Sequence, residues 1–131
     1  MTTEENKALI RKFCDEAFNK GKPQADFFVP DRPLHRPWGD QPGAISNIHA
    51  EVLDQVAEGD KVTTRWRATF THSGEFRTPW GSVIPASGKQ LSLTWLSIDR
   101  IAGGKIAESW VEGDWAGVLQ QLGAIPAPAA T

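Results

Sequence analysis

The sequence contains no tyrosine, one cysteine and three histidines among its 131 residues. Because Cys14 is alone, it cannot form an intrachain disulfide or a cysteine-rich metal site. Its place in a helical pattern predicts a small buried residue. The histidines His35, His49 and His72 show no paired ligand spacing, and the sequence has no glycine-rich phosphate loop or serine elbow. We therefore predict no metal site and no cofactor.

Long apolar runs and an excess of one charge are also missing. No segment reaches the roughly 20 apolar residues needed to span a bilayer. The N-terminal string MTTEENK lacks the basic start and apolar stretch of a signal peptide. The formal net charge of -2 gives no reason to expect a polyanionic partner. We expect a cytoplasmic protein that contacts neither membrane nor nucleic acid.

Tryptophan is the abundant residue, with six copies in a chain that is otherwise ordinary, at 40% hydrophobic and 23% charged residues. A chain of this length fits a single domain, since compact domains commonly hold about 100 to 150 residues. Large aromatic rings must be buried in a core, an interface or a ligand cavity, and composition does not decide among these.

The N-terminal part carries a helical pattern. Residues 2–20 predict an amphipathic helix, which Thr2 and Glu5 begin with capping-box spacing. A turn of helix is expected around Phe27, and a brief extended piece is expected at 34–35 before a loop rich in proline and glycine. The helix is therefore expected to precede an irregular segment that carries His35.

Alternating apolar residues follow from Ile48 onward and indicate strands. We predict two hairpins, made of residues 48–58 with 62–70 and residues 91–101 with 106–112. In the first strand the alternation predicts one shared face, made of Ile48, Ala50, Val52, Asp54 and Val56. The stretch between the hairpins, 72–89, is rich in glycine and proline and is expected to be a long excursion at the rim of a pocket. A short helix is expected at 114–122, and an extended or disordered Ala/Pro tail at 126–131.

Several local strings carry a family resemblance. They are VAEGDKV at 56–62, THSGEF at 71–76, GKIAESW at 104–110 and GVLQQLG at 117–123. In this order, over most of residues 5 to 125, they resemble the SnoaL-like polyketide cyclases of the NTF2-like superfamily. The resemblance implies an α+β cone, in which a curved antiparallel sheet of at least four strands packs against the N-terminal helix. Residues 1–125 would form this one domain.

The resemblance also implies an enzyme that moves protons on a cyclic or polyketide-like substrate in an apolar pocket, in the manner of an aldol cyclase. Asp114 matches the family's acid/base aspartate, and His35 matches its early histidine, which would orient the substrate or shuttle a proton. Each has an alternative interpretation. Asp114 could simply be the N-cap of the helix that follows, and His35 could pack against its own segment and bond the backbone.

The tryptophans are the candidate ligand-binding residues. Trp66, Trp95 and Trp110 fall on predicted strands and are expected on the concave face, while Trp38 and Trp80 lie in loops at the expected mouth. Core packing explains strand tryptophans equally well, and an interface explains loop tryptophans equally well.

The remaining polar residues of interest are expected at the surface. His49 and His72 are expected to be surface residues. Glu108 and Glu112 alternate with Trp110 on the last strand and are expected to be solvated or paired with Arg65 or Arg67 across the sheet. The alternative is that one of them joins Asp114 as a carboxylate pair.

Two departures from the family keep other functions open. Only about a dozen residues separate His35 from Ile48, where relatives place a further helix that helps wall the pocket, and 91–101 contains no histidine. A non-catalytic binding or assembly module is the main alternative, and an isomerase, dehydratase or epoxide hydrolase on the same fold is another. A missing wall would expose apolar surface, so we expect a homodimer that binds a small apolar ligand.

Overall fold

The computed structural model describes residues 1–36, 38, 41 and 43–126. The elements in chain order are α1 (Thr3–Phe13), the π-helix η1 (Cys14–Asn19), the 3-10 helix η2 (Gln24–Phe27), β1 (Leu34–His35), β2 (Ile45–Glu58), β3 (Lys61–His72), β4 (Phe76–Arg77), β5 (Val83–Ile84), β6 (Gln90–Ala102), β7 (Lys105–Gly113) and α2 (Trp115–Gln121). In the described residues, no helix combines the length and the apolar character that crossing a membrane requires.

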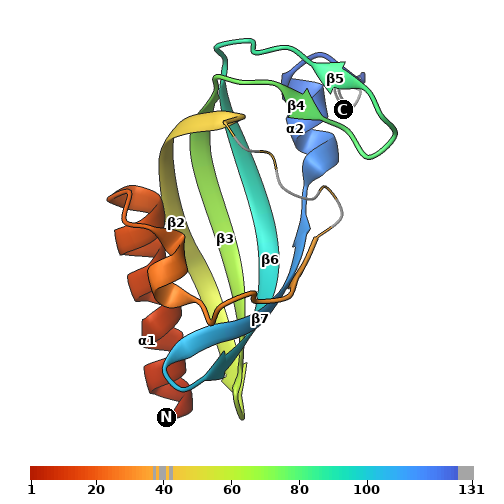
Figure 1. Cartoon of the computed structure of the whole chain (residues 1–131). Helices are drawn as coiled ribbons and strands as arrows, with labels where there is room; N and C mark the ends of the chain where they lie inside the picture. Colours follow the sequence, from red (N-terminus) through yellow and green to blue (C-terminus); the bar gives the residue numbers. More distant parts are fainter. Residues whose placement is uncertain (37, 39–40, 42, 127–131) are drawn as a thin grey trace.

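Five strands form one curved sheet in the order β1-β7-β6-β3-β2. All neighbouring pairs are antiparallel except β1 with β7, which is parallel. Figure 1 shows α1 packed along the β2 side of this sheet, with the small β4-β5 pair next to α2 at one end. The predicted α+β cone, with a curved sheet packed against an N-terminal helix, is confirmed.

The N-terminal helix forms as its sequence predicts. Thr2 Oγ1 accepts a hydrogen bond from the backbone N–H of Glu5 at 3.1 Å, and Glu5 Oε1 accepts one from the backbone N–H of Thr2 at 3.0 Å. The apolar face of the helix buries Ile10, Phe13 and Cys14 against the sheet. Burial raises the pKa of the Cys14 thiol to about 11, so it stays protonated and packs as a small core residue.

The alternation of β3 is also confirmed. Every second residue from Val62 to His72 is buried, on one face of the strand. His72 belongs to this row and is 0% exposed, so its expected surface position is wrong. The strand extends beyond Phe70, and the backbone N–H of Ser87 donates to His72 Nδ1 at 3.2 Å. His49 is exposed, as expected.

One predicted face is wrong in β2. The register with β3 shifts between Val52 and Asp54, as a β-bulge does, so the alternation reverses at Leu53. Val56 therefore points outward and is 68% exposed. Gln55 takes the inward position, where its side-chain amide donates to the carbonyl of Lys7 at 3.2 Å.

Two segments lie outside the regular elements, one between β1 and β2 and the other after α2. The described residues between β1 and β2 form no helix, which agrees with the short spacing in the sequence. The predicted Ala/Pro tail covers residues 126–131. Of these only Pro126 is among the described residues.

The outer edge of β2 is paired by a side chain rather than by another strand. Asn19 at the end of η1 accepts a hydrogen bond from the Ala50 backbone N–H at 2.7 Å and donates one to the Ala50 carbonyl at 2.9 Å. The Cys14 thiol lies 3.4 Å from the same carbonyl. An edge strand leaves such groups unpaired unless something covers them. Asn19 therefore fixes the helical segment to the sheet and satisfies its edge.

We expect Asn19→Ala to lower the free energy of unfolding by about 2 kcal/mol, because it leaves the Ala50 N–H without a partner and the Ala50 carbonyl with only the weak Cys14 thiol donor. Lys20→Ala is the control, since Lys20 only makes an exposed ion pair with Asp15 and its loss should change stability by less than about 0.5 kcal/mol. Urea unfolding followed by circular dichroism measures both. Equal effects of the two substitutions would contradict the role of Asn19.

Candidate functional site

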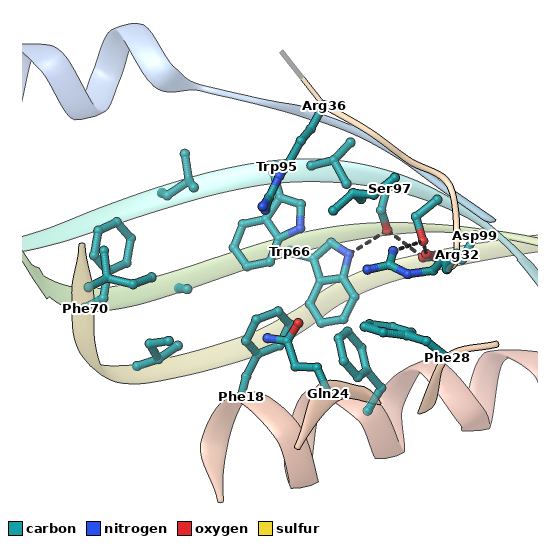
Figure 2. Close-up of a pocket in the computed structure, with 18 of the residues that line it drawn as sticks. Phe18, Gln24, Phe28, Arg32, Arg36, Trp66, Phe70, Trp95, Ser97 and Asp99 are labelled. Carbon is teal, nitrogen blue, oxygen red and sulfur yellow. Dashed lines mark hydrogen bonds between the residues drawn. The ribbon is translucent and has the colours of Figure 1, made fainter. Parts of the chain in front are cut away.

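A cavity of about 290 Å³ lies between the concave face of the sheet and the helical segments α1, η1 and η2 (Figure 2). Its walls are mainly aromatic, and include Phe13, Phe18, Phe28, Trp66, Trp95 and Trp115. Polar residues that line it are Gln24, Arg32, Arg36, Ser97, Asp99 and Ser109. An apolar cavity with a few convergent polar groups is typical of small-molecule sites.

The polar end of the cavity, defined by Arg32, Ser97, Asp99 and Ser109, is built around one buried carboxylate. Asp99 is 6% exposed and its inward position follows from the alternation of β6. The Ser109 hydroxyl donates to Asp99 Oδ1 at 2.5 Å, and the Ser97 hydroxyl donates to Oδ2 at 3.0 Å. Both serines are slightly more buried than Asp99, at 4% exposed for Ser97 and 3% for Ser109.

Two donor-only groups fix the direction of these hydrogen bonds. Trp66 Nε1 donates to Ser97 Oγ at 2.8 Å, and an Arg32 guanidinium nitrogen donates to Ser109 Oγ at 2.7 Å. An indole N–H and a guanidinium can only donate, so each hydroxyl accepts from one neighbour and turns its proton to Asp99. Figure 2 shows this chain of contacts, with Arg32 beside Asp99. The carboxylate therefore meets two oriented donors.

Burial raises the pKa of Asp99 above its usual value, because the charged form loses water in the cavity wall. Hydrogen bonds from Ser109 and Ser97, and the positive charge of Arg32, act against this rise. Arg32 is held in place from the other side, since its guanidinium carbon lies 3.6 Å from the centre of the Phe28 ring. A carboxyl with a raised pKa at the wall of an apolar cavity is suited to taking up and returning a proton.

Two of the five predicted ligand-binding tryptophans line the cavity. Trp66 and Trp95 are partners across β3 and β6, and their rings lie nearly parallel, at 5° and with centroids 5.3 Å apart. Phe18 meets both rings edge-on, at centroid distances of 5.7 Å from Trp66 and 6.1 Å from Trp95. The two tryptophan rings therefore stack on each other and, with Phe18, make this part of the cavity wall aromatic.

The other three tryptophans lie elsewhere. Trp110 is on the opposite face of the sheet, where it stacks on His35 and lies near Lys61. Trp38 stacks on Trp115 at 5.3 Å and meets Trp80 edge-on at 5.6 Å. Trp80 is 64% exposed. Trp38 and Trp80 therefore belong to an aromatic cluster over one end of the cavity, but neither is among the lining residues.

Asp114 is exposed and caps α2. Its Oδ1 accepts a hydrogen bond from the backbone N–H of Gly117 at 2.9 Å. A Cβ atom at position 117 would lie 2.4 Å from Asp114 Oδ2, so a larger residue there would require the carboxylate to move. Asp114 is not among the residues that line the described cavity.

His35 is also exposed and lies outside the described cavity. Its Nε2 is 2.8 Å from Glu108 Oε2, and its ring stacks on Trp110. Glu108 also pairs with Arg100 at 3.6 Å, so the predicted pairing of Glu108 with Arg65 or Arg67 is wrong. Since His35 lies opposite Trp110 and Asp114 lies four residues further along, the two are separated by roughly 13 Å along the strand. The structure does not bring the predicted pair together.

The polar end of the cavity was not predicted from the sequence. One signal in the sequence could have revealed this end. On the strand predicted at 91–101, alternation places Asp99 on the same face as Leu91, Leu93, Trp95 and Ser97. A carboxylate on the apolar face of a strand is unusual unless it is paired. The interactions of Arg32 and Ser109 with Asp99 depend on β1, β7 and β6 lying side by side. The spacing of residues in the sequence does not predict this arrangement. Among the described residues, no group of three or more His, Cys, Asp or Glu side chains could hold a metal ion.

Solved structures of similar fold span nearly the whole chain. AclR from Streptomyces galilaeus, described as a candidate hydroxylase, superposes with a TM-score of 0.79 at 23% identity, covering 98% of this chain and 87% of AclR. TsrD from Streptomyces laurentii gives 0.77 at 24% identity, covering 95% of this chain and 99% of TsrD. IdmH from Streptomyces antibioticus, described as a candidate polyketide cyclase, gives 0.68 at 28% identity, covering 94% of this chain and 99% of IdmH.

Comparison with curated proteins gives no match. The family model that describes the SnoaL-like polyketide cyclases matches residues 35–122, which is more than half of the chain and includes β2, β3, β6 and β7 of the large sheet. The fold, the aromatic cavity and this match agree, and the chain belongs to the SnoaL-like polyketide cyclase family.

Proposed function

We propose that this protein is a small-molecule enzyme that performs acid/base proton transfer on a cyclic or polyketide-like substrate, with Asp99 as the acid/base group. The observation that carries the proposal is the buried Asp99 at the polar end of an aromatic cavity. Family membership supports an enzyme that acts on small molecules. The raised pKa of Asp99 supports proton transfer, since a stronger base is closer in pKa to a carbon acid.

The reaction we favour is an intramolecular aldol closure. Asp99 takes a proton from a carbon next to a carbonyl, and the C–H electron pair forms an enolate. The enolate carbon attacks a second carbonyl of the same molecule, so a C–C bond forms and that carbonyl oxygen becomes an alkoxide. Asp99 returns the proton to the alkoxide. Arg32, whose charge faces the same end of the cavity, would stabilise the negative oxygen in both steps.

Other functions of the same cavity follow from the same contacts. An isomerase would return the proton to the far carbon of a conjugated dienolate, and a dehydratase would expel a hydroxyl group from the β carbon after the same first step. A non-catalytic binding module would use the aromatic walls alone and would not need Asp99 to exchange protons. The sequence-based assignment of Asp114 and His35 as catalytic residues stays a prediction, and so do the cytoplasmic location and the absence of a cofactor. The exposed positions of both side chains favour Asp99.

We also propose a homodimer, formed through the outer face of the sheet, which is the face turned away from α1. Antiparallel sheets with one solvated face normally carry polar residues there. Here β6, the central strand, presents Leu96 at 50% exposure and Ile98 at 41%. Val56, turned outward by the bulge in β2, adds to the exposed apolar residues. A second copy would cover this patch.

Asp99→Asn is expected to reduce proton abstraction by about 100-fold or more, because the amide cannot accept the proton. Exchange of α-hydrogens for deuterium in cyclic ketones and β-keto esters, followed by nuclear magnetic resonance, measures this step directly. Asp114→Asn is the matched control and should keep the exchange rate. Loss of exchange with Asp114→Asn alone would instead support the sequence-based assignment, and no exchange with the unmodified protein would support the binding module.

Stability should depend on pH through Asp99. Its pKa is raised in the folded state above 3.8, so the folded protein holds this proton to higher pH than the unfolded chain. The unmodified protein should therefore lose stability relative to Asp99→Asn as the pH rises from about 3.8 through the raised value, and the difference should stay constant above it. Urea unfolding at a series of pH values measures the difference. A relative gain in stability over that range would refute the raised pKa.

The dimer is tested by sedimentation equilibrium at micromolar concentration. Leu96→Arg combined with Ile98→Arg should give a folded monomer, because two charges would be buried in the interface. Val83→Arg is the control, since Val83 is 50% exposed on β5 and lies outside the outer face of the large sheet. A monomeric unmodified protein would exclude the dimer.

A further inference from the structure

The neutral donors at the polar end of the cavity are already engaged. The Ser109 and Ser97 hydroxyls both donate to Asp99, at 2.5 Å and 3.0 Å. The Trp66 indole N–H donates to Ser97 at 2.8 Å. None of these three protons is left to bind a polar group of the substrate that does not react. Such a group needs a neutral partner elsewhere in the cavity.

Gln24 can supply that partner. It is the only amide side chain among the described residues that line the cavity. Its amide makes no hydrogen bond to any residue in the described part of the chain. Figure 2 shows the amide directed away from η2 and into the space beside Phe18. A glutamine amide has one acceptor oxygen and two donor hydrogens, so Gln24 presents both kinds of group to the cavity.

The inward position of Gln24 follows from the helix that carries it. Gln24 begins η2, and Phe27 ends it three residues later. Residues three apart in a 3-10 helix lie one above the other, so the two share a face. Phe27 is 6% exposed and meets the Phe13 ring edge-on at a centroid distance of 5.5 Å, which turns this face toward the core.

Gln24 and Asp99 belong to opposite walls of the cavity. Asp99 lies on β6 in the sheet and is buried, whereas Gln24 lies on a helical segment that covers the concave face and is exposed. Gln24 therefore stands where the cavity opens to solvent. The volume of about 290 Å³ is at the small end of ligand pockets, which range over about 300–1,000 Å³. One small molecule can thus reach from Asp99 to the opening.

We propose that Gln24 is a specificity-determining residue, whose amide binds an uncharged oxygen of the substrate at the end remote from the carbonyl that reacts at Asp99. This inference rests on the proposed function and names its substrate class, which is small ketones that carry a second oxygen as a hydroxyl or carbonyl group. An amide pairs with either group. An apolar group at the same place would displace water from the amide and leave it without a partner, which costs binding free energy.

The test is isothermal titration calorimetry with 6-hydroxy-1-tetralone and, as an apolar counterpart of similar size, 6-methyl-1-tetralone. At mildly acidic pH the hydroxyl is uncharged. The unmodified protein should bind the hydroxy ketone about fivefold more tightly, as expected for one hydrogen bond between uncharged groups. Gln24→Leu should remove this preference. Gln24→Glu should retain it, because a carboxyl group still accepts a hydrogen bond from the hydroxyl, and a purely structural role of Gln24 would not give this rescue.

Gln90→Leu is the matched control. Gln90 is exposed at the start of β6 and is not among the residues that line the cavity, so this variant should keep the fivefold preference. Equal affinity of the unmodified protein for the two ketones would overturn the proposal. So would no binding of either ketone, or a preference that survives Gln24→Leu.

Deuterium exchange separates this proposal from the proposed function. Asp99→Asn should lose exchange of the α-hydrogens but keep the preference for the hydroxy ketone, because the contact with Gln24 does not require a proton acceptor at position 99. Exchange by the unmodified protein without a hydroxyl preference would refute the role of Gln24 alone. A hydroxyl preference without exchange would refute the proposed reaction alone.

Discussion

The structure depends on one constraint, which is that a single helical segment must cover the concave face of a five-stranded sheet. α1 and η1 pack along β2 and β3, and Asn19 fixes them to the edge of β2 at Ala50. Because one segment cannot reach across to β6 and β7, large aromatic side chains fill part of the remaining space and leave a cavity. Three of the six tryptophans, Trp66, Trp95 and Trp115, line this cavity, since large rings can wall a cavity without a second helix.

The same constraint explains why a carboxylate can be held inside. Ser97 and Ser109 occupy neighbouring inward positions on β6 and β7, and donor-only groups on β3 and in the segment before β1 orient their hydroxyls. A buried carboxylate without such donors would be protonated or unstable. β6 and β7 supply the two serines that bond Asp99, and β3 and the segment before β1 supply the donors that orient those serines. The site is therefore a property of the assembled sheet rather than of any local motif.

The fold could be predicted from the sequence because its signals are local. Capping by Thr2, the alternation of β3 and the hairpin turns each depend on residues close in sequence. The candidate site could be predicted only in part. Trp66 and Trp95 follow from alternation, whereas the inward pairing of Asp99 with Ser109 requires the register of β6 with β7. The bulge at Leu53 and the burial of His72 were missed for the same reason, since a register shift and the end of a strand depend on a partner strand.

The short segment between β1 and β2 changes how one end of the cavity is closed. Relatives are expected to place a helix there, and the described residues of this segment form none. Trp115, from the first turn of α2, lines the cavity and stacks on Trp38 at 5.3 Å, while Phe76 on β4 meets both rings edge-on at 5.7 and 6.0 Å. Three elements distant in sequence thus supply the apolar cover that a helix would give. Asp114 caps α2, the helix that carries Trp115, by accepting a hydrogen bond from the backbone N–H of Gly117. This cap positions the apolar cover, so Asp114 has a structural role at the site whether or not it takes part in the chemistry.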